Sequence, residues 1–333
     1  MTPTLVAAFV IALFAPLRHV GDGCVLAANV LLAVGLYELG RDAQRGRWLR
    51  AAAAISAIWV AWQLGERFVL ARSVEAFEAC RLAMAALWIA RAIALVIGLD
   101  GRRAPIAAAV ALVGSALLSA QVLPPVFDYM HAHGPLDQLY RPAALVLWVG
   151  GGLGLLARSG IAPPVQDPER LARRLRRAAA ALWLRAIGIT ALLVAVRCFP
   201  VTSDMIELAV RDAPLLFQLL GLVAAAMLLV VGEQNAVIGA ALVAASVGIR
   251  HTYAPYAELA GLALIATAIP AASRILLVTF LVLGGAALAF GGPYYTVTGV
   301  GALIAYARLL QRAAFVAAQT PAAPRATLRP PPV

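Results

Sequence analysis

The chain has 333 residues, of which 63% are hydrophobic and 13% are charged. Soluble domains carry about 25% charged residues, so this composition leaves too little polar surface for a soluble protein of this length. The net charge of +11 would suggest nucleic acid as the partner of a soluble chain. Here the arginines cluster in short gaps between apolar segments, which indicates membrane topology and anionic lipid headgroups and excludes nucleic acid as the expected partner.

Twelve apolar segments follow one another along the sequence, and a membrane-spanning helix needs about 20 such residues. They lie at 4–20, 23–39, 51–71, 82–99, 104–123, 141–158, 178–198, 214–232, 235–249, 257–272, 275–290 and 295–316. The predicted fold is an all-α, polytopic membrane bundle of 10–12 transmembrane helices with no soluble domain. Residues 235–272 fit either two full spans or a re-entrant hairpin, and this alternative decides between twelve spans and ten.

The arginines are distributed unevenly over the gaps between these segments. Seventeen lie in the gaps after the second, fourth, sixth, eighth and tenth segments and at the C-terminal end. The alternate gaps hold six, which are Arg18, Arg72, Arg81, Arg141, Arg211 and Arg250. Positively charged residues are retained on the cytoplasmic side. We therefore predict a multi-pass protein of the cytoplasmic (inner) membrane, with the N-terminus and the C-terminus both in the cytoplasm.

The longest predicted cytoplasmic gap divides the chain into two parts. Residues 1–160 form a first transmembrane half of about six helices, and residues 178–317 form a second half. Between them lies a basic linker at 161–177, whose ERLARRLRR run predicts an interfacial helix on anionic headgroups. The Pro/Ala-rich end at 318–333 predicts a disordered cytoplasmic tail.

Short matches between the two halves suggest a 6+6 internal repeat. LLAVG at 31–35 resembles LLVVG at 228–232, and LVGSALLSA at 112–120 resembles VLGGAALAF at 282–290. The two matches require different offsets in residue number between the halves, so the sequence only suggests this repeat.

Histidine and cysteine concentrate on the predicted outer side. All four histidines lie in outer gaps and all three cysteines lie at outer helix ends: His19, His131, His133, His251, Cys24, Cys80 and Cys198. If the outer face is periplasmic, the cysteines are either free thiols or contribute one disulfide.

The longest outer gap, at 124–141, contains Asp128, His131 and His133. Imidazole and carboxylate groups suit general acid–base catalysis and zinc or copper binding, but a stable metal site needs a third or fourth ligand fixed in space. We therefore expect no metal and no cofactor. The three residues are candidate catalytic or substrate-binding groups, and the alternative is an ordinary polar loop.

Ionisable residues inside the apolar segments are candidates for a functional site, because a charge at the bilayer centre costs roughly 2.5–3.5 kcal/mol on insertion scales. Arg91 lies in the middle of the fourth segment and Glu66 near the outer end of the third. Trp59, Trp62, Gln63 and Glu66 recur at helical spacing and share one face, and Glu66 and Arg91 would differ in depth by about 6 Å. Glu66, Arg91, Gln63 and Trp62 are therefore predicted to bind substrate in a polar cavity. The alternative is a structural ion pair that joins two helices.

Three functions fit this sequence. The first is a secondary transporter or flippase of a small or amphiphilic substrate across the cytoplasmic membrane, favoured by twelve spans with a central linker. The second is a membrane-embedded enzyme that acts on lipid-linked or exported substrates at the outer face, favoured by the outer histidines. The third is a non-catalytic membrane subunit of a larger assembly, with partner membrane subunits, favoured by the lack of nucleotide-binding, metalloprotease and hydrolase motifs. Membrane lipids are expected partners in all three.

Overall fold

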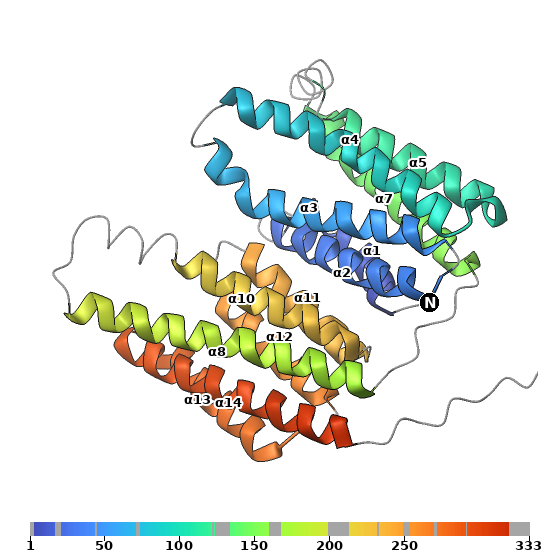
Figure 1. Ribbon diagram of the computed structural model, residues 1–333. Coiled ribbons are helices and arrows are strands. Elements are labelled where there is room, and N and C mark those ends of the chain that lie inside the picture. Colours follow the sequence, from blue (N-terminus) through green and yellow to red (C-terminus); the bar gives the residue numbers. More distant parts are fainter. Residues whose placement is uncertain are drawn as a thin grey trace, which may run out of the picture.

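The computed structural model contains twelve α-helices and two short 3₁₀ helices, η1 (Gly101–Arg103) and η3 (Leu229–Val231), among the residues that it describes (Figure 1). These are residues 3–16, 21–43, 45–70, 74–121, 123, 134–159, 168–198, 213–231, 233–248, 254–269, 272–290 and 292–319. Each α-helix overlaps one of the twelve apolar segments, so the all-α fold predicted from the sequence is confirmed.

The first six helices form one group, drawn in blue to green in Figure 1. They are α1 (Pro3–Ala12), α2 (Gly21–Asp42), α3 (Gly46–Leu70), α4 (Val74–Gly98), α5 (Pro105–Ala120) and α7 (Gly134–Arg158). Each helix packs against the next one in the sequence, and α7 also contacts α1. Because neighbours in sequence are neighbours in space, short connections suffice to turn the chain back and forth.

The second six helices form a group of the same kind, drawn in yellow-green to red. They are α8 (Pro168–Cys198), α10 (Ala213–Leu228), α11 (Gln234–Gly248), α12 (Ala254–Ala268), α13 (Arg274–Phe290) and α14 (Gly292–Gln319). Again each helix packs against the next, and α14 returns to α8. The order of neighbours is thus the same in both groups, while the internal repeat that the sequence suggested stays a prediction.

Small residues set the closest helix contacts. A Cβ added to Gly114 of α5 would lie 2.4 Å from the backbone nitrogen of Trp148 in α7, and one added to Gly239 of α11 would lie 2.4 Å from the carbonyl oxygen of Gly261 in α12. Only glycine fits at such distances. In an apolar solvent, close backbone approach of this kind is a main source of helix association.

Five of the helices contain a stretch that is long and apolar enough to cross a membrane: Gly21–Arg41, Glu78–Gly98, Leu139–Arg158, Pro168–Val196 and Val297–Gln319. Five such helices indicate a multi-pass membrane protein. In the region left open by the sequence, α11 and α12 are two separate, closely packed helices of 15 residues each. A helix of that length is about 22 Å long, which is shorter than a straight span.

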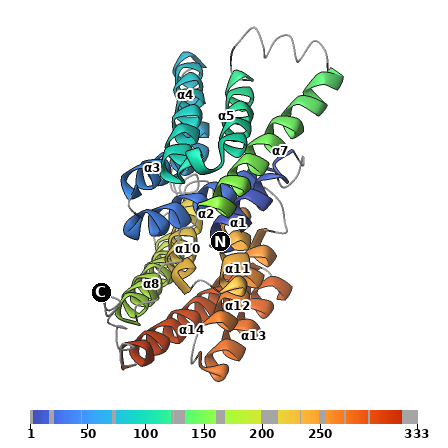
Figure 2. The ribbon, with the colours of Figure 1, turned by 90° about the vertical axis from the view of Figure 1, so that its right-hand side faces the viewer.

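The two groups meet mainly through α2. This helix packs against α11 and touches α10, and α1 also contacts α11. At the start of α2, a Cβ added to Gly248 of α11 would lie 2.5 Å from the Cα of Gly23. Figure 2 shows α4, α5 and α7 on one side of this junction and α13 and α14 on the other. The N-terminus and the last turns of α14 lie at the same end of the helices (Figure 1).

Candidate functional site

Arg91 is completely buried near the middle of α4. A Cβ on Gly98 of this helix would lie 2.7 Å from the Leu49 side chain of α3, so these two residues are at one height. Trp88 precedes Gly98 by ten residues on α4, and Trp59 follows Leu49 by ten residues on α3. Both tryptophans therefore lie about 15 Å from the Gly98–Leu49 contact, in one layer. Since helical side chains lean toward the N-terminus, the guanidinium of Arg91 points toward the same layer, where it lies over the ring of Trp88.

An uncharged side chain of α2 contacts the polar end of Arg91, and a side chain of α3 supports it. Its Nη1 donates a hydrogen bond to Oδ1 of Asn29 in α2 at 2.6 Å. The Nδ2 of Asn29 donates in turn to Oε1 of Gln63 in α3 at 3.3 Å. Gln63 thereby fixes the amide of Asn29 with its oxygen toward the arginine. The three residues connect α2, α3 and α4 in one buried polar chain.

Aromatic rings surround the rest of the guanidinium. Its carbon lies 4.3 Å from the ring centroid of Trp88 and 5.2 Å from that of Trp148 in α7. Trp59 meets Trp88 edge-on at 5.0 Å, and Phe9 of α1 packs against Trp148 at 5.0 Å. A desolvated cation over an indole face gains about 2 kcal/mol. The rings therefore compensate for part of the cost of burying the charge.

The cluster has more hydrogen-bond donors than acceptors. The Nε and Nη2 atoms of Arg91 and the indole nitrogens of Trp59 and Trp88 are buried and have no hydrogen-bond partner among the described residues. Nε and Nη2 form one edge of the guanidinium, which is the edge that binds a carboxylate or phosphate with two parallel hydrogen bonds. No acidic side chain within the described ranges forms an ion pair with Arg91. Among the described side chains, this site therefore has no negatively charged acceptor.

The structure brings together only some of the residues that the sequence singled out. Arg91 and Gln63 are members of the cluster, and Trp62 is half-buried beside Gln63 on α3. The backbone of Glu66 belongs to α3, but its side chain lies outside the described residues, so the Glu66–Arg91 ion pair stays a prediction. Asn29 was missed, although an asparagine within an apolar segment is itself a signal of a polar contact.

The candidates Asp128, His131 and His133, in the gap predicted to be on the outer side, lie outside the described part of the chain. Their proposed catalytic or binding roles therefore stay predictions. Within the described residues, no three His, Cys, Asp or Glu side chains are placed to hold a metal ion. The cysteines are free thiols, with Cys198 exposed and Cys24 and Cys80 half-buried.

A second intrahelical arginine is held in a different way. Arg185 of α8 forms a two-point ion pair with Glu258 of α12, through Nη1 to Oε1 and through Nη2 to Oε2, the latter at 3.1 Å. A Cβ on Gly221 of α10 would lie 2.6 Å from the Nη1 of Arg185. The absence of a side chain at Gly221 therefore leaves the space that the ion pair occupies.

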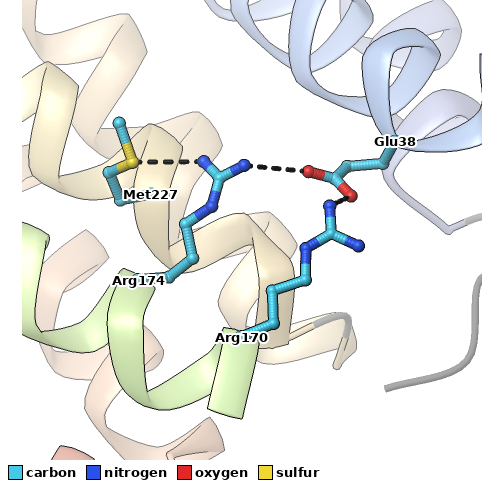
Figure 3. Close-up of polar contacts among 4 residues, drawn as sticks. All are labelled: Glu38, Arg170, Arg174 and Met227. Carbon is cyan, nitrogen blue, oxygen red and sulfur yellow. Dashed lines mark hydrogen bonds and ion pairs between the residues drawn. The ribbon is translucent and has the colours of Figure 1, made fainter. Parts of the chain in front are cut away.

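A third charged group joins the two halves of the molecule (Figure 3). Both carboxylate oxygens of Glu38, near the end of α2, accept from arginines in the first turns of α8: Oε2 from Arg170, and Oε1 from Arg174 at 3.1 Å. The other terminal nitrogen of Arg174 lies 3.1 Å from the sulfur of Met227 in α10. One carboxylate thus holds two guanidinium groups at the junction of α2, α8 and α10.

No protein-family model, curated protein or solved structure matches this chain. Its class therefore rests on its own features: an all-α bundle with several helices able to cross a membrane, and a buried arginine that lacks an acidic partner among the described residues.

Proposed function

We propose that this protein is a secondary transporter or flippase that carries a small or amphiphilic anion across the cytoplasmic membrane, with Arg91 binding the negative group. The observation that carries the proposal is the surplus of buried hydrogen-bond donors around Arg91 among the described residues. Each buried donor left without an acceptor costs about 1–3 kcal/mol, and more when it is charged. An anion that supplies the acceptors removes this cost, so the site favours its ligand strongly.

The chemistry of the cluster matches a carboxylate or phosphate attached to an apolar group. The free edge of Arg91 accommodates two oxygens of the anion, and the indole nitrogens of Trp59 and Trp88 add further donors. Trp148 and Phe9 are buried in this conformation, and in an open conformation their rings would offer an apolar surface to the remainder of the ligand. A neutral ligand would supply acceptors and leave the positive charge uncompensated.

The arrangement of the helices supports transport. Two groups of six helices with the same order of neighbours meet through α2, and transporters often bind substrate near the bilayer midplane and rock one such half against the other. Asn29 belongs to α2 and contacts Arg91 directly. A movement of α2 relative to α4 therefore changes the binding site. Because Arg91 is completely buried, this conformation is closed around it, and the proposal requires conformations in which Arg91 is open to either side.

Glu66 has a defined role in this proposal. It follows Gln63 by three residues on the same face of α3. A carboxylate at that position serves as the counter-ion of Arg91 when no substrate is bound, and the substrate anion displaces it. We further propose the orientation that the arginines predict, with both termini in the cytoplasm, and we assign ten to twelve helices as spans.

The binding test uses the full-length protein in a nonionic detergent. Thermal unfolding is measured with inorganic phosphate, acetate, alkyl carboxylates and alkyl phosphates, and with alcohols of the same chain length. We expect at least one alkyl anion to raise Tm and its matched alcohol to leave Tm unchanged. Arg91→Gln should abolish the response and Arg91→Lys should reduce it at least about tenfold in apparent affinity, because lysine cannot bind two oxygens in parallel.

The matched control is Arg308→Gln, which removes an exposed arginine that also lies over an indole, that of Trp183. It should keep the full response. Proteoliposomes loaded with the stabilising anion then test counterflow. A series in which no anion stabilises the protein, or in which stabilisation persists in Arg91→Gln, would overturn the proposed site. Binding without counterflow would overturn transport and leave an anion-binding subunit or enzyme.

A further inference from the structure

The charged group at the junction of the two halves contains more arginines than the two that bind Glu38. We call it the junction cluster, and its members are Glu38, Arg41, Arg170, Arg173, Arg174 and Arg177. Arg41 lies in the last turn of α2, and the other four arginines lie in the first three turns of α8. The cluster therefore draws side chains from both halves of the molecule.

These arginines are close enough to repel one another. The charges of Arg177 and Arg41 act on Arg174, and the charge of Arg173 acts on Arg170. Glu38 is the one acid in the cluster, and Glu169 is the one acid in α8. Even with both counted, five arginines face two glutamates among the side chains that the structure describes here, which leaves a surplus of three positive charges within this set. A surplus of this size in one place attracts an anion.

Three of the five arginines are accessible to such an anion. Arg170 and Arg174 are mostly buried and bind Glu38. Arg41, Arg173 and Arg177 have exposed side chains. Arg41 belongs to the first half, and Arg173 and Arg177 belong to the second. An anion bound by all three would bridge the two halves beside the Glu38 contact.

The surface of α8 indicates which kind of anion fits beside these arginines. Arg173 and Arg177 begin a stripe that continues along the same face through Leu184, Ile187 and Val194, all of them exposed. The spacings of three, four and seven residues place them in one row. From Arg177 to Val194 the row is about 25 Å long, close to the thickness of the hydrocarbon core. A headgroup phosphate at the arginines would therefore have its acyl chains along apolar side chains.

We propose that the junction cluster binds the phosphate of an anionic phospholipid between Arg41 of α2 and Arg173 and Arg177 of α8. The lipid then holds the two halves together at the end where Glu38 joins them, so the stability of the junction depends on the membrane's content of anionic lipid. This site is separate from Arg91 and does not depend on the transported substrate.

The experiment titrates the full-length protein in nonionic detergent with phosphatidylglycerol, with phosphatidylcholine and with glycerol phosphate, and counts bound lipid by native mass spectrometry. We expect phosphatidylglycerol to bind and raise Tm. The variant Arg41→Gln/Arg177→Gln keeps both arginines that hold Glu38. It should weaken phosphatidylglycerol binding by about fivefold for each arginine removed, because one basic residue near an anionic surface contributes about 1 kcal/mol.

Arg102→Gln/Arg158→Gln is the matched control, since both residues are exposed arginines on other helix ends; it should bind lipid like the wild type. If the double variant at the junction fails to fold, Arg173→Gln replaces it, with one fivefold step expected. Equal binding of phosphatidylcholine would overturn the phosphate site. Equally tight binding of glycerol phosphate would show that the site recognises a free phosphate ester and not a lipid. Equal weakening of phosphatidylglycerol binding in the control would show that net charge causes the effect, which would overturn the site.

Discussion

Arg91 and Arg185 both lie within long helices, one in each half of the molecule, and their surroundings differ. Arg185 in the second half faces the carboxylate of Glu258 with two hydrogen bonds. Arg91 in the first half donates one hydrogen bond to an amide and lies over two indole rings. The first arrangement is neutral as a whole. The second keeps a full positive charge among the described side chains.

If the proposed function holds, this difference separates a structural charge from a functional one. A paired buried charge contributes to holding helices together, and removing one partner leaves the other uncompensated. A buried charge without a partner reduces stability, and selection keeps such a residue when the function needs it. The Arg185–Glu258 pair is therefore interpreted as part of the scaffold, and Arg91 as the place where a ligand completes the site.

The largest effect is expected for Glu258→Gln. It leaves the charge of Arg185 inside the bundle without its carboxylate, and breaking a buried pair from one side costs about 3 kcal/mol. Unfolding in a titration with a denaturing detergent measures the loss. The double variant Glu258→Gln/Arg185→Met should regain most of it, because both charges are then gone. A double variant as unstable as the single one would show that the pair is not what stabilises α8 against α12.

Gly221→Ala should have the next largest effect on stability. The new Cβ would lie 2.6 Å from Nη1 of Arg185 and 3.2 Å from Oε1 of Glu258, so the ion pair must shift, at about 1 kcal/mol. Gly150→Ala in α7 is the matched control, because nothing lies within 4 Å of its added Cβ. It should leave the unfolding midpoint unchanged or slightly raised. Equal effects of the two substitutions would mean that Gly221 is not needed for the pair.

Arg91→Met tests whether Arg91, unlike Arg185, contributes little to stability. It removes the buried charge, a gain of about 2.5–3.5 kcal/mol on insertion scales, and loses the Asn29 hydrogen bond and the ring contacts, which together offset most of this gain. We expect stability within about 1 kcal/mol of the wild type and complete loss of the anion response. Arg185→Met, measured in parallel, should lose about 3 kcal/mol. A loss of that size for Arg91→Met would instead identify a structural partner, with Glu66 as the first candidate.

The sequence predicted the helices well because apolar length is a local property. All twelve segments became helices, and the basic run before residue 178, for which the sequence also predicts a helix, is continuous with the seventh segment in α8 (Pro168–Cys198). The first turns of this helix contain arginines that an apolar segment excludes. The helix and the apolar segment therefore begin at different residues. Arg91 was found because a charge in an apolar segment is costly, and Gln63 because it shares a helical face with its tryptophans.

Contacts between distant helices could not be predicted in this way. Trp148 reaches Arg91 from α7, and Glu258 reaches Arg185 across 73 positions of sequence. Glu38 meets Arg170 across 132 positions. Each of these residues has an ordinary local setting in the sequence, and its partner is determined by how the helices pack. Periodicity identifies the face of one helix and does not identify which other helix covers it.

The smallest effect is expected for Gln63, which acts on Arg91 only through Asn29. Gln63→Leu removes the acceptor of the Asn29 amide, a long contact at 3.3 Å, and hydrogen bonds between membrane helices average about 0.6 kcal/mol. Stability should fall by that amount, and the anion response should weaken without being lost.

Gln63→Glu separates orientation from charge, because it keeps the acceptor and adds a negative charge near Arg91. If the missing group at Arg91 is an anion, Gln63→Glu should stabilise the ligand-free protein relative to Gln63→Leu and reduce the anion response further. An unchanged response in Gln63→Glu would show that negative charge is not what the free edge of Arg91 requires.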